Sequence, residues 1–275
     1  MNLIMRVLSA LILLPIVVYL ILAGGSFLEF ATIFIVFISS FELCAMAYPL
    51  HKKSTWLFSC GGALFFAGLL HATTPTSVLL LVMALCGGAG ILSLVPNDDS
   101  KTSQNPYFLV FSLCYVAIGI ASMVFLRRLE QPAHFGRDLF FLLLIVVWAN
   151  DIFAYFFGKA FGKHKLAEKI SNSKTWEGFI AGASFGIATP IALWWCLAPF
   201  TDVGQSLTLP TILAIGISGA LFGPLGDLVE SRMKRIFGVK DSGTILPGHG
   251  GILDRIDALL LLAPWTLAYA IIFCK

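Results

Sequence analysis

The sequence predicts an all-α fold: a polytopic integral membrane protein with about nine transmembrane helices and a cytoplasmic N-terminus. Composition and hydropathy pattern both predict it. The 275 residues are 58% hydrophobic and only 12% charged, with a mean hydropathy of +0.91, which excludes an ordinary soluble domain. The apolar residues gather in nine segments, each close to the roughly 20 residues that cross a bilayer.

Each apolar segment is expected to be an α-helix, because backbone N–H and C=O groups cannot stay unpaired in lipid. The first segment resembles a signal peptide, but it is long and no A-x-A-like site follows it, so we interpret it as the first helix. The third and eighth segments are short and contain glycine. In chain order, the predicted spans cover residues 7–23, 27–48, 55–72, 76–96, 107–126, 139–157, 178–199, 209–226 and 256–273.

The distribution of positive charge predicts the orientation. With nine spans and the N-terminus inside, 14 of the 18 lysines and arginines fall on the cytoplasmic side, as the positive-inside rule requires. The loop at 127–137 argues the other way. In this topology the two charged loops, 158–177 and 227–255, share the cytoplasmic face. The net charge of +3 is modest and implies no nucleic-acid surface, and the six cysteines form no CxxC pair.

Residues 231–257 carry eight charges in 27 residues, on both sides of a Pro-Gly-His-Gly-Gly turn. If the eighth helix continues past residue 226, Asp227, Ser231 and Lys234 lie on one face at i, i+4 and i+7. Asp254 and Asp257, at i and i+3, share a face of the next helix. The three carboxylates on two neighbouring helices could hold one or two hard cations. The alternative is that Asp227 and Asp257 cap helix ends or pair with Lys234 or Arg255.

The glycines of the turn, Gly248, Gly250 and Gly251, allow positive φ and close approach, so their amides could cradle phosphate oxygens. For glycines alone, a tight interhelical turn without a ligand is the favoured alternative. His249 lies between them and could have one of three roles: an acid or base, a hydrogen-bond donor to phosphate, or a structural residue that stabilises the turn. We favour a phosphate or structural role.

A second polar cluster extends over residues 148–178. Asn150 and Asp151 lie inside the sixth predicted span, where polar groups are costly and usually functional. Five lysines follow, and a basic surface that attracts anionic lipid is the alternative for those at 159, 163 and 165. The Ser-Lys-Thr-Trp-Glu-Gly sequence at 173–178 leads into the next helix and adds Lys174, Thr175 and Glu177 to the candidates.

These two segments resemble the bacterial-type phosphatidate cytidylyltransferase (CDP-diacylglycerol synthase) family. Residues 231–257 are similar to its signature: Ser-x-hydrophobic-Lys-Arg, Lys-Asp-x-Gly, and Pro-Gly-His-Gly-Gly-x-x-Asp-Arg-hydrophobic-Asp. Residues 171–178 are similar to its Ser-Pro-x-Lys-Thr-x-Glu-Gly motif, with Asn172 where proline is usual, and residues 158–165 also resemble the family. The first half of the chain is similar only in hydropathy.

The resemblance implies that CTP and phosphatidic acid react to give CDP-diacylglycerol and pyrophosphate, in phospholipid biosynthesis. It implies magnesium as cofactor, one or two ions on Asp227, Asp254 and Asp257, and a bacterial inner membrane with the site facing the cytoplasm. The implied catalytic residues are Asp227, Ser231, Lys234, Asp254 and Asp257. The implied substrate-binding residues are Asp151, Lys174, Thr175, Glu177, Arg235, Lys240, Asp241, Gly248, His249, Gly250, Gly251 and Arg255.

Two other functions remain alternatives: a CTP-dependent transferase acting on a polyprenol or another lipid phosphate, and a membrane transporter. Against the transporter, the charges gather at one face and no internal repeat is visible. We expect an N-terminal helical part, 1–138, and a catalytic part, 139–275, that together form one membrane domain. A homodimer is left open. Glu29 and Glu42, lone acids in the second span, have no assigned role beyond pairing with polar groups of neighbouring helices.

Overall fold

Eight of the nine predicted spans lie on helices of the computed structural model, which describes residues 3–47, 52–72, 106–130, 132–168, 170–199, 201–246, 248 and 250–274. The ninth, 76–96, lies outside the described residues. The long helices are α1 (Leu3–Ala23), α2 (Gly25–Ala47), α3 (Lys52–Ala72), α6 (Pro106–Arg127), α7 (Phe135–Phe161), α8 (Trp176–Leu197), α10 (Leu209–Ile236) and α11 (Leu253–Phe273), with a four-residue α9 (Val203–Ser206).

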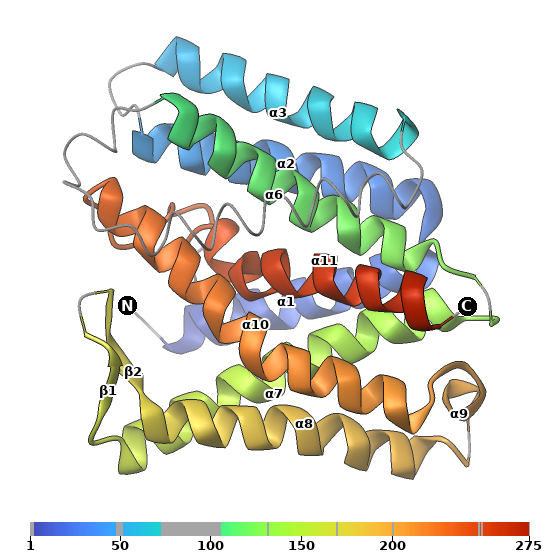
Figure 1. Cartoon of the computed structure of the whole chain (residues 1–275). Coiled ribbons are helices and arrows are strands. Elements are labelled where there is room, and N and C mark those ends of the chain that lie inside the picture. The colour runs from blue at the N-terminus through green and yellow to red at the C-terminus, as the bar shows by residue number, and fades with distance from the viewer. Residues whose placement is uncertain are drawn as a thin grey trace.

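Five of the described helices are long and apolar enough to cross a membrane: α2, α7, α8, α10 and α11. The described parts of α1, α3 and α6 contain shorter apolar stretches. The protein is therefore an α-helical membrane protein, as predicted. The helices run roughly side by side, with α2, α3 and α6 in one layer, α7 and α8 in another, and α10 and α11 between them (Figure 1).

The core lies around α11, which packs against both α6 and α10. Its leucines at 260 and 262 are fully buried. Gly119 on α6 allows this contact, because a Cβ there would lie 2.8 Å from the Leu260 carbonyl oxygen. Small residues let membrane helices approach closely where the hydrophobic effect gives little driving force between them.

α8 approaches α7 closely through small residues, and Phe185 of α8 also stacks on Phe153 of α7. Its buried positions, at four-residue intervals, are Gly178, Gly182, Gly186 and Pro190. A Cβ at Gly182 would lie 2.8 Å from the Asn150 carbonyl oxygen of α7. Several large apolar side chains of α8 are exposed, among them Ile180, Leu193 and Trp195, as expected for a helix that faces lipid.

The helix predicted at 209–226 continues to Ile236 as α10. It crosses α11 beside Gly226, where a Cβ would lie 2.5 Å from the Asp257 carbonyl oxygen and 3.1 Å from the Ala258 Cα. This crossing brings Asp227 next to the first turns of α11. The absence of a side chain at Gly226 therefore sets the distance between the two helices that carry the predicted carboxylates.

We expect Gly226→Ala to destabilise the protein by about 1–3 kcal/mol, the usual cost of forcing extra atoms into a packed contact. Thermal unfolding of the purified protein in detergent would measure it. Gly61→Ala on α3 is the matched control, because a Cβ there meets nothing within 4 Å. An unchanged melting temperature in Gly226→Ala would contradict the close crossing.

A short antiparallel hairpin, β1 (Lys165–Ala167) and β2 (Ser171–Thr175), departs from the all-α prediction. Lys165 pairs with Thr175 and Ala167 with Ser171, with an irregularity between them. The hairpin follows α7 and leads directly into α8, at the same end of the helices as the C-terminal end of α10 (Figure 1). It was not predicted, because its sequence of lysines and serines has neither apolar alternation nor a recognisable turn.

Candidate functional site

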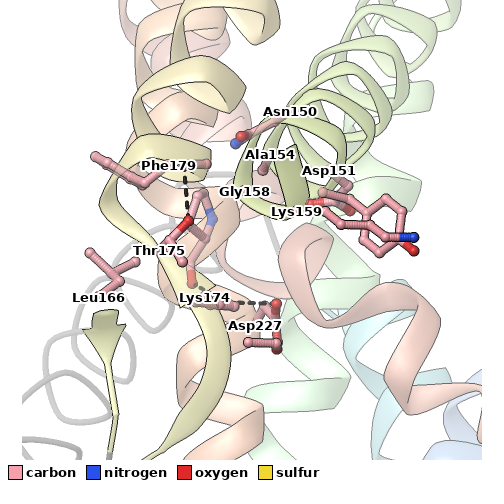
Figure 2. Close-up of a pocket in the computed structure, with 14 residues that line it drawn as sticks. Asn150, Asp151, Ala154, Gly158, Lys159, Leu166, Lys174, Thr175, Phe179 and Asp227 are labelled. Carbon is pink, nitrogen blue, oxygen red and sulfur yellow. Dashed lines mark hydrogen bonds and ion pairs between the residues drawn. The ribbon is translucent and has the colours of Figure 1, made fainter. Parts of the chain in front are cut away.

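A pocket of about 460 Å³ lies where α7, the hairpin, the start of α8 and α10 meet. Figure 2 shows Asn150 and Asp151 on α7, Lys174 and Thr175 at the end of β2, and Asp227 on α10. All but Asn150 were predicted site residues. The structure thus brings the second polar cluster together with the first carboxylate of the charged segment.

The ion pair between Lys174 and Asp227 joins these two segments. The Lys174 Nζ lies 2.6 Å from Asp227 Oδ2, and it also donates to the Pro224 carbonyl oxygen at 3.4 Å. Ser231, one turn further along α10, donates to Asp227 Oδ1 at 3.2 Å. Two members of the predicted column, Asp227 and Ser231, therefore lie together on one face of α10.

Thr175 has a local structural role at the pocket wall. It is the N-cap of α8, and its hydroxyl accepts the Gly178 N–H at 3.2 Å. Such a cap supplies one of the partners that the first N–H groups of a helix lack. Gly158 on α7 lies close by, since a Cβ there would be 3.1 Å from Thr175 Oγ1. Thr175 therefore fixes the hairpin, α7 and α8 against one another beside Lys174.

Asp151 lies among charges of both signs. The carboxylates of Asp257 and Asp227 repel its negative charge, and the cations Lys174 and Arg255 attract it. Asp227 and Asp257 also repel each other directly. Negative charge therefore collects between α7, α10 and α11, and the surrounding lysine and arginine offset it only in part.

Lys234 lies at the centre of a buried charge cluster below this region. Its Nζ is 2.6 Å from Asp254 Oδ1 and 3.2 Å from Glu230 Oε1. Glu230 is only 1% exposed, and neither of its carboxylate oxygens accepts a well-aligned hydrogen bond from the described residues. Sequence analysis missed Glu230, although its spacing of four residues from Lys234 is that of a helical ion pair.

Asp254 closes the charged turn, residues 237–252, against the start of α11. In addition to Lys234, it accepts the N–H of Ser242 at 3.1 Å and that of Gly251 at 3.0 Å. The Gly251 amide is thus already hydrogen-bonded within the protein. Gly248 and Gly250 have φ of 80° and 83°, a region that glycine enters without strain. His249 lies outside the described residues.

Several other predicted substrate-binding residues do not line the pocket. Glu177 accepts from His164 Nδ1 at 2.6 Å and so ties α8 to the hairpin. Arg235 donates to the carbonyl oxygens of Ile170 and Val239, at 3.4 and 2.9 Å. The side chains that are exposed to solvent on the same side are Lys240, Asp241 and Arg255.

Within the described ranges, no group of three or more His, Cys, Asp or Glu side chains is already assembled as a metal site. The Asp227 carboxylate is already paired with Lys174. The Asp254 carboxylate is already paired with Lys234 and accepts hydrogen bonds from two backbone amides. The donor chemistry nevertheless fits a hard cation. Asp227 and Asp257 repel each other. The buried carboxylate of Glu230 shares the Lys234 ammonium with Asp254, so added positive charge would stabilise this region.

A sequence model of the cytidylyltransferase family matches residues 4–273, so the similarity also includes the N-terminal helices. The phosphatidate cytidylyltransferase of Staphylococcus aureus (strain COL) is 35% identical over 266 residues, which is 94% of this chain and 95% of that protein. The phosphatidate cytidylyltransferases of Staphylococcus saprophyticus and Staphylococcus haemolyticus are also 35% identical, over 260 and 266 residues, with the same shares covered.

Proposed function

This chain belongs to the cytidylyltransferase family, and we propose that its reaction takes place between the Lys174–Asp227 pocket and the first turns of α11. The protein is a phosphatidate cytidylyltransferase, a nucleotidyltransferase of the membrane that makes CDP-diacylglycerol from CTP and phosphatidate. The observation that carries the site is the 2.6 Å ion pair from Lys174 to Asp227, which joins the two family motifs in one pocket.

The reaction brings two polyanions together. A phosphate oxygen of phosphatidate attacks the α-phosphorus of CTP in line, the new P–O–P bond forms, and pyrophosphate leaves with the electron pair of the bond that breaks. The attacking monoester is already largely anionic near neutral pH, so the protein needs no general base. Positioning and charge stabilisation are therefore the main tasks of the protein.

The basic side chains around the pocket have different roles, according to where they lie. Lys174, in the pocket at the end of β2, would bind phosphate oxygens of CTP, and Thr175 would hold that lysine in place through its cap on α8. Arg255, exposed on the first turn of α11, would bind the phosphate of phosphatidate through its planar guanidinium. Lys234 would fix the orientation of Asp254 and add positive charge beneath the site.

Members of this family generally use divalent cations, and Asp227, Asp254 and Asp257 are the carboxylates proposed to hold one or two Mg²⁺ ions. Such ions neutralise charge on the α-phosphate and on the leaving pyrophosphate when bound. In the present arrangement Lys174 and Lys234 neutralise Asp227 and Asp254 instead. Lys174, which lines the pocket, carries its charge on a flexible stem, so it can shift toward a phosphate when Asp227 takes another partner.

The direct experiment is pyrophosphate release from CTP by the purified protein, with and without phosphatidate. We expect release that requires phosphatidate and is much slower when polyprenyl phosphate replaces it. Equal rates with both lipids would favour the alternative of a broader lipid-phosphate transferase. Release without any lipid, or none with phosphatidate, would contradict the proposed reaction.

We further propose nine spans, a site that faces the cytoplasm of a bacterial inner membrane, and CTP entry from that aqueous side. Ser173 lines the pocket and is exposed, so we expect Ser173→Cys, in a chain without its native cysteines, to be labelled in inside-out vesicles. CTP should slow that labelling. A homodimer stays a prediction.

Thr201→Cys provides the matched control for this topology. Thr201 is exposed and lies beyond the other end of α8, so the Thr201→Cys variant should be labelled only from the opposite side and without an effect of CTP. Labelling of Ser173→Cys from that opposite side would contradict both the orientation and the position of the site.

A further inference from the structure

Glu42 lies on α2, far from the catalytic segments in sequence, and is only 2% exposed. Its carboxylate accepts three hydrogen bonds from the charged turn and from α11. Ser242 Oγ donates to Oε2 at 3.2 Å, the Ile252 N–H to Oε1 at 3.0 Å and the Leu253 N–H to Oε2 at 2.9 Å. Both carboxylate oxygens are therefore used, and every donor comes from residues at least 200 positions away in the chain.

The two amides that Glu42 binds are the first of α11, since Ile252 is the N-cap and Leu253 the first helical residue. The N–H groups at a helix start have no partner within the helix. The Ile252 side chain contains no hydrogen-bond acceptor, so it cannot cap these N–H groups. Glu42 takes that place from another helix, and its negative charge is also favourable at the positive end of the α11 dipole.

The charged turn is folded directly against this carboxylate. A Cβ at Gly243 would lie 2.7 Å from Glu42 Oε1, and a Cβ at Gly251 would lie 2.6 Å from Glu42 Oε2. Gly243 and Gly251 are thus both needed for contact with Glu42, and Gly251 is one of the three glycines predicted to cradle phosphate. The side chain fits because the turn presents backbone and a hydroxyl to it, with no side-chain carbon in between.

The start of α11 is consequently held from two sides. Glu42 binds the amides of Ile252 and Leu253, and Asp254 binds the amides of Gly251 and Ser242 while it pairs with Lys234. Glu42 does not line the Lys174–Asp227 pocket. Any effect that it has on the reaction must therefore pass through the position of the turn and of Asp254 and Asp257.

We infer that Glu42 is a positioning residue of the reaction: it fixes the charged turn and the first turn of α11 so that Asp254 and Asp257 face α10. This inference rests on the proposed function of those aspartates. It also makes α2 part of the catalytic unit, so that the N-terminal helices do more than anchor the protein in the membrane.

The test compares Glu42→Gln and Glu42→Ala with Glu29→Gln. Glu29 is the other acid of α2, and its partner is Arg128 at 2.6 Å, away from the charged turn. We expect the turnover of Glu42→Gln to fall roughly 10- to 100-fold, the cost of misplacing catalytic groups by about 1 Å. Glu42→Ala should be worse, since it accepts no hydrogen bond, and Glu29→Gln should be close to wild type.

Hydrogen exchange provides a readout that does not depend on activity. In Glu42→Gln the amides at 242–253 should exchange faster, while those of α8 and the far end of α11 exchange as in the wild type. Unchanged exchange at 242–253, or a uniform increase in all helices together with a matching loss of melting temperature, would overturn the positioning role. If the wild type made no CDP-diacylglycerol, the proposed function would fail while the exchange result still reported on Glu42.

Discussion

Asp227→Asn is expected to lower turnover by roughly 10²- to 10³-fold, the usual cost of removing one group that stabilises charge in a transition state. Asparagine keeps the size of the side chain and can still accept from Ser231, which now donates to Asp227 at 3.2 Å. It loses the negative charge that pairs with Lys174 and that would bind a hard cation. Steady-state rates with CTP and phosphatidate over a range of magnesium concentrations would measure the effect.

Asp254→Asn and Asp257→Asn should show losses of the same order, with protein that still inserts and purifies. Asp202→Asn is the matched control, because Asp202 is exposed and makes no side-chain cap to α9. Its turnover should equal that of the wild type. Near-normal activity of Asp227→Asn or Asp254→Asn at ordinary magnesium would remove the three-aspartate cation site from the mechanism.

Lys234→Arg is the second variant with a large expected loss, even though it keeps the positive charge. The Lys234 ammonium lies 2.6 Å from Asp254 and 3.2 Å from Glu230, and the residue is only 9% exposed. A guanidinium is larger and planar, so it cannot fit between these two carboxylates without displacing one of them. We expect a fall in turnover of about 10²-fold, with a smaller change in KM, because the groups displaced are those that position Asp254.

Lys165→Arg gives the comparison for a lysine that is exposed on the hairpin, and its activity should stay close to that of the wild type. A Lys234→Met variant separates charge from shape, since it leaves Glu230 and Asp254 without their shared cation and should also lower the melting temperature. Equal and mild effects of Lys234→Arg and Lys165→Arg would mean that Lys234 only adds to a basic surface.

The sequence allowed the helices and the motif residues to be predicted because both depend on local pattern. Apolar segments of sufficient length predicted eight described helices, and the period of 3.6 residues placed Asp227 and Ser231 on one face of α10. The pairing of charges could not be read in this way. Asp227 was considered as a partner of Lys234, but its partner is Lys174, and Lys234 pairs with Asp254.

What escaped prediction depends on contacts between distant segments. Glu42 is one acid in an apolar helix, and no local pattern indicates that it lies against the charged turn some 200 residues later. Glu230 was overlooked because it precedes a run of charged residues at the end of α10, so its burial follows only from the packing of α10 on α11. Periodicity shows which face of a helix is apolar, but it does not show which helix covers that face.

In the ion pair between Lys174 and Asp227, each side chain neutralises the charge of the other. A nucleotide that bound only to Lys174 would leave the Asp227 carboxylate without a positive partner. A cation that bound only to Asp227 would leave the Lys174 ammonium without a negative partner. An unbalanced charge beside apolar helices costs more than it does in bulk water.

A cation–nucleotide complex supplies both countercharges in one exchange, so neither side chain is left unbalanced. By thermodynamic reciprocity, each component then raises the affinity of the other by the same factor. The lysine and the aspartate thus favour binding of the cation and the nucleotide together: the assembled complex binds more tightly than the separate affinities of its components would suggest.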